Sequence, residues 1–370
     1  MELVNATAFA AAYTLGIEPS GRERVVVAVK GTFDFPAAGA VATPAAAQAP
    51  LVMADTFDGA PGFSSPVYEV DFAPGKKRCD ILVIGNAHAL EGRPVDRMRV
   101  GLRVGAVSKL FSVVGERVWQ AGVTGVSASR PKPFTTLPLS YCRAFGGNDT
   151  ADPEAKNHSA YMANPVGVGY HRVSLSGIID GRPLPNQEEE KRPVASPTGK
   201  YQPMSCGPVG RGWQPRLGFA GTYDDAWLKN TFPFLPGNFE DAYYQAAPAD
   251  QQGAHLLGGE EVVLLGLTPE GRTQFRLPAV ELPVTFFRKS GGYQEVPAVA
   301  DTLLIEPDLR RVTITWRASH PLKRDIFELP QALIGRKSRA WWIARETGKE
   351  YYPSIGALVR ERAANRAGNA

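Results

Sequence analysis

Residues Arg24–Phe35, RVVVAVKGTFDF, decide the fold class. The stretch begins with an apolar run and then alternates, which is the pattern of a strand buried on both faces or placed at the centre of a sheet. Arg99–Val104 (RVGLRV) and Arg311–Arg317 (RVTITWR) alternate with a period of two. We therefore predict a mainly β protein with a minor helical part, built as an antiparallel sandwich or barrel-like scaffold.

Shorter runs extend this pattern in both directions. In the first third, the opening segment 1–19 is interpreted as the first strand, and further strands are predicted at Tyr68–Phe72, Asp80–Ile84, Leu110–Val114 and Glu116–Trp119. The last two flank Gly115, which predicts a tight hairpin there. Towards the C-terminus, strands are predicted at Glu261–Leu267, Gln274–Leu277, Val284–Arg288 and Thr302–Glu306, and helical spacing at Ser354–Arg366.

Between about residues 130 and 252 regular periodicity fades, and prolines, glycines and aromatic residues crowd together. Only Asp224–Lys229 and Glu240–Gln245 resemble short helical turns in this stretch. The chain is therefore divided into a β-rich part (1–130), a loop-rich aromatic segment (131–255) and a second β-rich part with a short C-terminal helix (256–370). The sequence leaves open whether these three parts form one compact unit.

Composition excludes several classes of protein. Across 370 residues the net charge is only +4, which gives no reason to expect nucleic acid or a membrane as the partner. The cysteines Cys79, Cys142 and Cys206 are widely spaced and make no disulfide framework. No apolar run approaches the ~20 residues of a membrane-spanning helix, and Glu2 stands where a secretory signal would be positive. We expect a soluble cytoplasmic protein.

A search for catalytic signatures finds no nucleophile elbow, zinc-protease motif, phosphate-binding loop or calcium loop. The densest run of potential metal ligands, Asp149, Asp152, Glu154 and His158, is interpreted as solvated turns. The acidic run Glu188–Glu190 is interpreted as a solvated face, with a partner-contacting knob as the alternative. We therefore expect no catalytic residue, no metal and no cofactor.

The loop-rich segment contains unusual clusters in which aromatic residues stand among glycines and prolines. Such residues either pack over irregular loops or form a rigid recognition surface. The candidate partner-binding or loop-organising residues are Tyr141, Arg143, Phe145, Asn164, Tyr170, Trp213, Arg216, Tyr223, Asp224 and Trp227. An arginine among glycines commonly binds loop carbonyls, so charge reversal at Arg143 or Arg216 is expected to harm folding more than binding.

These clusters resemble a known family. The strings are YCRAFGG (141–147), NPVGVGY (164–170), LPN (184–186), WQPR (213–216), AGTYDDAW (220–227), FPFLPGNF (232–239), YYQAAPADQQ (243–252) and LLGGEEVVLLGL (256–267). In this order they resemble a bacterial family catalogued as a domain of unknown function, whose members are encoded beside type VI secretion genes and act as adaptors or chaperones for toxic effectors. The resemblance runs from about residue 3 to about residue 317.

The resemblance implies a non-enzymatic cytoplasmic adaptor that binds an effector toxin and helps load it onto the spike trimer, through a spike-tip protein of the proline-alanine-alanine-arginine type. The matching positions, here called the signature residues, are Tyr141, Arg143, Phe145, Gly146, Gly147, Asn164, Pro165, Gly167, Gly169, Leu184, Pro185, Asn186, Trp213, Arg216, Gly221, Thr222, Tyr223, Asp224, Trp227, Pro233, Pro236, Ala247, Pro248, Gln251, Gln252 and Glu260. Cys142, the length of the acidic run and the tail beyond Ala318 depart from the family pattern.

Two other functions remain open at this point. The first is an enzyme that acts on carbohydrate or the cell wall, in which aromatic loops stack on sugars and a carboxylate pair from Asp149, Asp152, Asp224 or Asp225 lies about 5–10 Å apart. The second is a structural, baseplate-like component, which would assemble with itself.

Overall fold

The computed structural model describes residues 1–18, 20–123 and 125–360. Its largest sheet has seven strands within these residues, in the order β17-β5-β22-β23-β3-β2 with β4 paired to β3. The strands are β2 (Ala10–Ile17), β3 (Glu23–Asp34), β4 (Thr43–Pro44), β5 (Cys79–Val83), β17 (Gln252–Gly253), β22 (Val299–Glu306) and β23 (Arg311–Pro321). The mainly β prediction is confirmed.

The strand β3 is the centre of this sheet, as its apolar run predicts. It pairs with β2 on one side and along its length with β23 on the other. Val25 to Val29 are fully buried, which a strand covered on both faces requires. On one face Phe33 packs edge-on against Trp316 of β23, with ring centroids 6.3 Å apart.

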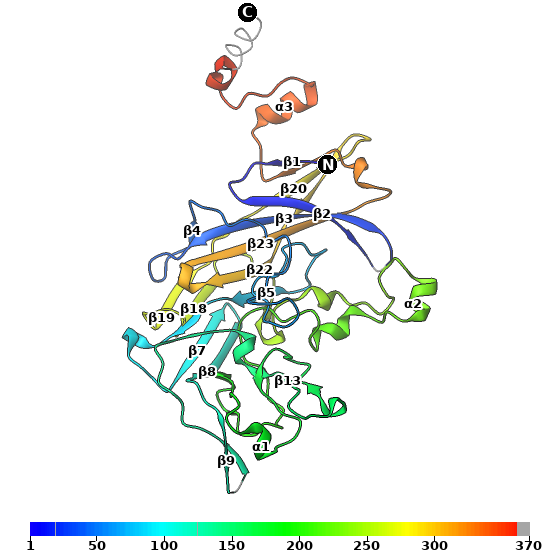
Figure 1. Cartoon of the computed structure of the whole chain (residues 1–370). Helices are drawn as coiled ribbons and strands as arrows, with labels where there is room; N and C mark the ends of the chain where they lie inside the picture. Colours follow the sequence, from blue (N-terminus) through cyan, green and yellow to red (C-terminus); the bar gives the residue numbers. More distant parts are fainter. Residues whose placement is uncertain (19, 124, 361–370) are drawn as a thin grey trace, which may run out of the picture.

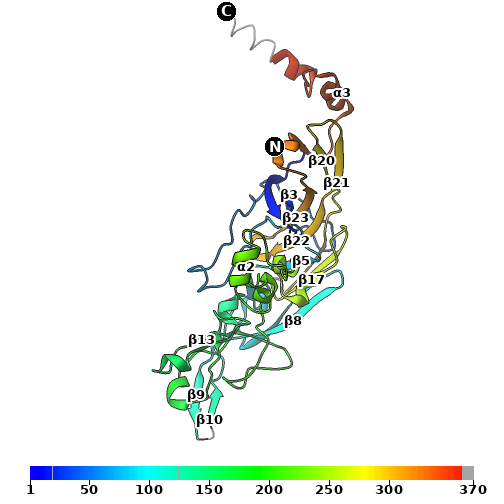
Figure 2. The ribbon, with the colours of Figure 1, turned by 90° about the vertical axis from the view of Figure 1, so that its right-hand side faces the viewer.

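Two further sheets flank the largest one. The order in one is β16-β8-β7-β18-β19, formed by β7 (Arg97–Val104), β8 (Val107–Val114), β16 (Gln187–Glu188), β18 (Glu261–Leu265) and β19 (Arg272–Arg276). The order in the other is β1-β24-β20-β21, formed by β1 (Glu2–Asn5), β20 (Pro283–Phe287), β21 (Tyr293–Pro297) and β24 (Gln331–Ile334). The molecule is elongated, with β20 and the N-terminus towards one end and the β9–β10 hairpin (Trp119–Gly122 and Gly125–Ala128) at the other (Figures 1 and 2).

Strands from both ends of the chain alternate in these sheets. β5 is the parallel neighbour of β22, and β7 is the antiparallel neighbour of β18. One hydrophobic cluster accordingly joins Val27, Val100, Leu264 and Val284, which lie on strands of all three sheets. The β-rich parts 1–130 and 256–370 therefore share both sheets and core, and the middle segment joins them through β16 and β17.

Short elements complete the described fold. The remaining strands are β6 (Asn86–His88), β11 (Thr136–Pro138), β12 (Phe145–Gly146), β13 (Asn148–Asp149), β14 (Ser159–Ala160) and β15 (Val168–Gly169). The α-helices are α1 (Ser176–Ile179), α2 (Asp225–Asn230) and α3 (Arg339–Thr347). The 3-10 turns are η1 (Leu90–Gly92), η2 (Tyr141–Arg143), η3 (Ala155–Asn157), η4 (Arg216–Ala220), η5 (Asp241–Tyr244), η6 (Ala249–Gln251), η7 (Pro307–Leu309) and η8 (Ile326–Glu328). Among the described residues, no helix is long and apolar enough to cross a bilayer.

The predicted hairpin at Gly115 is wrong. The strand β8 ends at Val114 and pairs with the preceding strand β7, so the hairpin turn lies before β8. Gly115 is needed for a different reason, because a Cβ there would lie 1.8 Å from the carbonyl oxygen of Lys132. Close approach of two backbone segments, and not a turn, accounts for this glycine.

The predicted strand Tyr68–Phe72 is also wrong. These residues have no regular structure, and side chains hold the segment against the largest sheet. The Asp71 carboxylate accepts hydrogen bonds from Lys30 and Thr315, and its backbone carbonyl accepts one from Arg317. The segment is therefore held on a sheet by the contacts of Asp71 instead of joining the sheet as a strand.

Towards the chain ends, the structure differs from the sequence expectations in part. The opening segment forms two strands, β1 and β2, which belong to different sheets. The elements β21, β24 and α3 have no counterpart in the sequence prediction. Of the predicted helix at Ser354–Arg366, positions 355–360 are helical and positions 361–366 lie outside the described residues.

Candidate functional site

Several signature aromatics form the small core of the middle segment. Phe145 is fully buried, and its ring meets those of Tyr161, Tyr170 and Tyr201 edge-on at centroid distances of 5.1, 6.4 and 4.9 Å. Trp119 belongs to the same cluster and donates from Nε1 to the carbonyl of Gly169 at 3.2 Å. Phe145 and Tyr170 therefore organise loops, since aromatic packing replaces the regular hydrogen bonding that loops lack.

The strings YCRAFGG and NPVGVGY are fastened to each other. The buried Asn164 donates from Nδ2 to the carbonyls of Tyr141 (2.8 Å) and Phe145 (3.1 Å). Gly146 has φ 151°, and a Cβ there would lie 2.1 Å from the carbonyl oxygen of Asn164. Only glycine fits this contact, and β12 can then pair with β15.

Arg216 binds the loop carbonyls, as its position among glycines and prolines predicts. Nε donates to Tyr243 O at 2.8 Å, and Nη1 donates to Val209 O at 2.7 Å. Nη2 forms an ion pair with Glu69 at 2.5 Å. The expectation is not met at Arg143, because its Nη1 donates to a side-chain oxygen, Asn186 Oδ1, at 3.1 Å.

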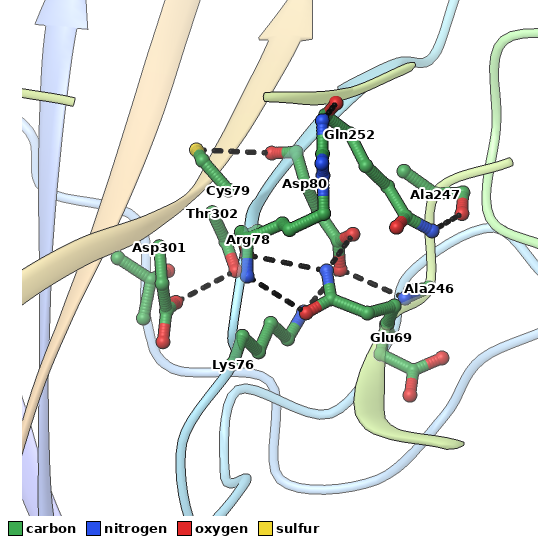
Figure 3. Close-up of polar contacts among 12 residues, drawn as sticks. Glu69, Lys76, Arg78, Cys79, Asp80, Ala246, Ala247, Gln252, Asp301 and Thr302 are labelled. Carbon is green, nitrogen blue, oxygen red and sulfur yellow. Dashed lines mark hydrogen bonds and ion pairs between the residues drawn. The ribbon is translucent and has the colours of Figure 1, made fainter. Parts of the chain in front are cut away.

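The string YYQAAPADQQ is locked onto the largest sheet by a buried carboxylate. Asp80 of β5 is 0% exposed and accepts from Lys76 Nζ at 2.6 Å, from Gln245 Nε2 at 2.7 Å and from the Ala246 amide at 2.8 Å. Figure 3 shows Asp80 facing Lys76 and the Ala246 amide from the strand. Gln251 adds hydrogen bonds from Nε2 to the carbonyls of Ile81 and Cys206. These contacts position the string as a loop on the sheet.

The signature residues around α2 differ from all of these, because they stand out into solvent. Residues 221–239 form a projection at the side of the molecule, here called the α2 lobe (Figure 1). Its neck is closed by Thr222 and Asn238, whose backbone and side chains exchange hydrogen bonds, and by the Glu240 amide, which donates to Phe219 O at 2.9 Å. The lobe is therefore a defined unit held at its base.

Aromatic rings stiffen the α2 lobe from inside. Trp227 meets Tyr223 and Phe232 at centroid distances of 4.7 and 5.7 Å, and its Nε1 donates to Phe234 O at 2.9 Å. Asp224 caps α2, since its carboxylate accepts from the Trp227 amide at 2.8 Å.

The lobe nonetheless exposes several large apolar side chains, beside exposed polar residues such as Asp225, Lys229 and Asn230. Tyr223, Leu228, Phe232 and Phe234 are 53%, 58%, 63% and 44% exposed. The sequence analysis selects Tyr223 and Trp227 as candidates but misses Leu228, Phe232 and Phe234. Phe232 and Phe234 lie within the motif string FPFLPGNF. Several exposed apolar side chains on a braced loop are typical of a protein-binding surface.

A groove lies near the foot of the lobe. It encloses about 530 Å³ and is lined mainly by apolar and aromatic residues, among them Tyr141, Tyr201, Phe219, Ala247 and Pro248. Arg216 also lines the groove, but its guanidinium is already bound to loop carbonyls and to Glu69. Its lining, within the described residues, includes no carboxylate.

Comparison with known protein families assigns the chain to one of them. A family model described as an uncharacterized protein conserved in bacteria (DUF2169) matches residues 20–317. The chain belongs to this family. The match spans the signature strings of the middle segment, so the loops described above lie within the DUF2169 region. Searches of curated proteins and of solved structures each find no match.

The acids considered for glycoside hydrolysis have local roles in this DUF2169 chain. Asp149 is buried, contrary to the solvated turn expected, and its carboxylate accepts from the Arg172 amide at 2.8 Å and contacts His171 Nδ1 at 3.3 Å. Hydrogen bonds from the Glu154 amide and from Asn157 lower the pKa of Asp152.

The other two candidate acids belong to α2. Asp224 is its cap and Asp225 lies in its first turn. A general acid would need a raised pKa, whereas the hydrogen bonds to Asp152 lower the pKa of that carboxyl group. Within residues 1–18, 20–123 and 125–360, no cluster of three or more histidine, cysteine or acidic residues is arranged to hold a metal ion.

The interpretation of the acidic run Glu188–Glu190 as a solvated face is wrong for Glu188. Glu188 is 1% exposed, not solvated. It accepts from Arg97 at 2.5 Å, from Arg117 at 2.9 Å and from the Val194 amide at 3.0 Å. The cause is tertiary, because Glu188 lies on β16, which pairs with β8 and carries its side chain inward. A run of three glutamates gives no sign of this burial.

Proposed function

We propose that this protein is a non-enzymatic adaptor that binds a partner protein through the α2 lobe. Following the family resemblance of its signature strings, the partner is a toxin effector of type VI secretion, which the adaptor helps load in the cytoplasm onto the spike-tip protein and spike trimer. One observation carries the proposal. Tyr141, Phe145 and Trp213 of the signature are buried, whereas Tyr223 and its neighbours on the lobe are exposed.

The physical argument is the free-energy cost of leaving apolar side chains exposed to solvent. Burying a large apolar side chain gains about 1.5–3 kcal/mol, so the chain could gain stability by folding these residues inward. It instead closes the neck and braces Trp227 from inside, so that Phe232 and Leu228 face solvent. A surface held in shape loses little conformational entropy on binding, which favours affinity.

The test is a pull-down of the tagged full chain from the bacterium that produces it, followed by mass spectrometry. We expect one toxin-like protein together with a spike-tip protein. The double variant L228S/F232S should recover at least about tenfold less partner, since each residue is a large apolar anchor. F327S is the matched control, because Phe327 is 75% exposed at η8, outside the lobe.

The outcomes separate the alternatives. Full partner recovery by a L228S/F232S variant that melts normally would rule out the lobe as the binding surface. Recovery of the chain alone, from cells that make the secretion machinery, would contradict the adaptor function. A symmetric ring made of this chain would indicate the baseplate-like component instead.

A further inference from the structure

A second pocket lies away from the α2 lobe, beside the end of β8. It encloses about 500 Å³, and its charged lining consists, in the described residues, of the cations Arg117, Arg130, Lys132 and Arg143 and one carboxylate, Glu116. Val118, Val168, Pro183 and Leu184 form aliphatic walls. We call it the cationic pocket. Arg143 is a signature residue that neither the loop contacts nor the proposed lobe fully explains.

The charges of the cationic pocket are not balanced by neighbouring acids. Glu188 pairs with Arg117 at 2.9 Å, but the same carboxylate also serves Arg97. Lys132 has Glu116 3.5 Å away at an exposed position. The neighbourhood therefore holds more cations than carboxylates, and low-dielectric walls concentrate the resulting positive potential.

The guanidinium of Arg143 is available for a ligand. Its one contact with a neighbouring side chain, among the described residues, is the hydrogen bond from Nη1 to Asn186 Oδ1. Arg130 has no carboxylate within ion-pair distance in the part of the chain that the structure describes. An arginine fork with unused N–H groups is suited to bidentate binding of a carboxylate.

We propose that the cationic pocket binds an acidic polypeptide segment, with a ligand carboxylate at Arg143 and Arg130 and neighbouring aliphatic side chains against Val118 and Pro183. The described lining includes no aromatic ring on which a nucleotide base could stack, so mixed aliphatic and cationic walls favour a peptide. This inference rests on the charge and shape of the pocket and holds independently of the α2 lobe.

The test uses the full chain and a fluorescein-labelled peptide that alternates leucine with glutamate, compared by anisotropy with a matched peptide in which glutamine replaces glutamate. The acidic peptide should bind at least about tenfold more tightly, because charge-assisted hydrogen bonds are lost in the neutral one. Its binding should weaken as salt is raised.

Variants locate the site. R143Q should weaken acidic-peptide binding about tenfold, and R130Q about threefold, because Arg130 is exposed. R130Q removes no structural contact, so it tests the pocket even if R143Q disturbs the Asn186 loop. R336Q, an exposed cation outside the pocket, is the control and should change nothing.

Three results would overturn the proposal: no binding of the acidic peptide, equal binding of both peptides, or unchanged affinity in both R143Q and R130Q. Complete displacement of the peptide by an equal concentration of inorganic phosphate would show a site for small anions, which also contradicts the polypeptide ligand. L228S/F232S should keep peptide binding, so failure of the lobe and failure of the pocket can be told apart.

Discussion

Removal of the Asp80 carboxylate should detach the YYQAAPADQQ string from the largest sheet. In the D80A variant, three donors lose their acceptor: Lys76 Nζ at 2.6 Å, Gln245 Nε2 at 2.7 Å and the Ala246 amide at 2.8 Å. Lys76 is itself buried, with 2% of its side chain exposed, so its charge would remain inside without its closest partner (Figure 3). The ammonium group would have to find water or lose its proton.

The expected magnitude follows from these contacts. Removing one member of a buried ion pair costs about 3–5 kcal/mol, and each stranded donor adds about 1–3 kcal/mol before relaxation. Because the loop can move and let water in, we expect D80A to lower the free energy of unfolding by about 4 kcal/mol in total. K76M should cost less, about 2 kcal/mol, because Asp80 keeps the Gln245 and Ala246 donors.

Two measurements check this reasoning. Urea unfolding gives the free energies, and the double variant K76M/D80L should recover part of the D80A loss, since apolar residues often replace a buried pair well. Hydrogen exchange should show the Ala246 amide losing protection before Val27 in β3 does. A D80A loss below about 1 kcal/mol, or a K76M loss larger than that of D80A, would refute the account.

Three further changes test the remaining structure. G146A should lower the free energy of unfolding by at least about 2 kcal/mol, because its Cβ would meet Asn164 O at 2.1 Å and φ is 151°; denaturant titration measures this. R216E should prevent cooperative melting, because a carboxylate would face Glu69 and two carbonyl oxygens; a soluble R216E that melts normally yet loses its partner would contradict it. Burial, with a contribution from Arg288, lowers the pKa of His320, so the unfolded chain binds more protons and stability should fall as the pH drops below about 6.5. H320Q should flatten that part of the curve of unfolding free energy against pH, and an unchanged slope would contradict the assignment.

At the central strand of the largest sheet, the local sequence pattern and the tertiary environment agree. The apolar run of Arg24–Phe35 lies between two strands and is covered on both faces, so burial matches composition at every position from Val25 to Val29. Arg311–Arg317 is also a strand, in β23, but burial does not follow its alternation, because Thr313, Thr315 and Arg317 are buried too. Local pattern fails where side-chain contacts hold a segment on a sheet that it does not join, as at Tyr68–Phe72.

The candidate site could be predicted in part. The motif strings directed attention to the middle segment, and the choice between loop packing and recognition was left open for each aromatic residue. Phe145 and Trp213 pack loops, whereas Tyr223 is exposed on the α2 lobe. The three stand in similar glycine- and proline-rich surroundings in the chain, so local sequence cannot distinguish them.

The cationic pocket is a second feature that local sequence does not predict. Arg117, Arg130 and Arg143 are spread over three loops, and their convergence depends on how β8 and the signature loops meet. Glu188 was interpreted as a solvated charge, although strand pairing carries it inward to Arg97 and Arg117. Separation along the sequence predicts neither the convergence of these arginines nor the burial of Glu188.

By itself, the sequence determined the mainly β class, the positions of the central strands and membership of the signature family, because each depends on short-range pattern or on strings of neighbouring residues. Tertiary structure decided which strands became neighbours, since hydrogen bonds between β5 and β22 join segments more than 200 residues apart. It also decided which aromatic side chains remained exposed and which charges were buried, because burial is a property of the whole packed molecule and not of any stretch of it.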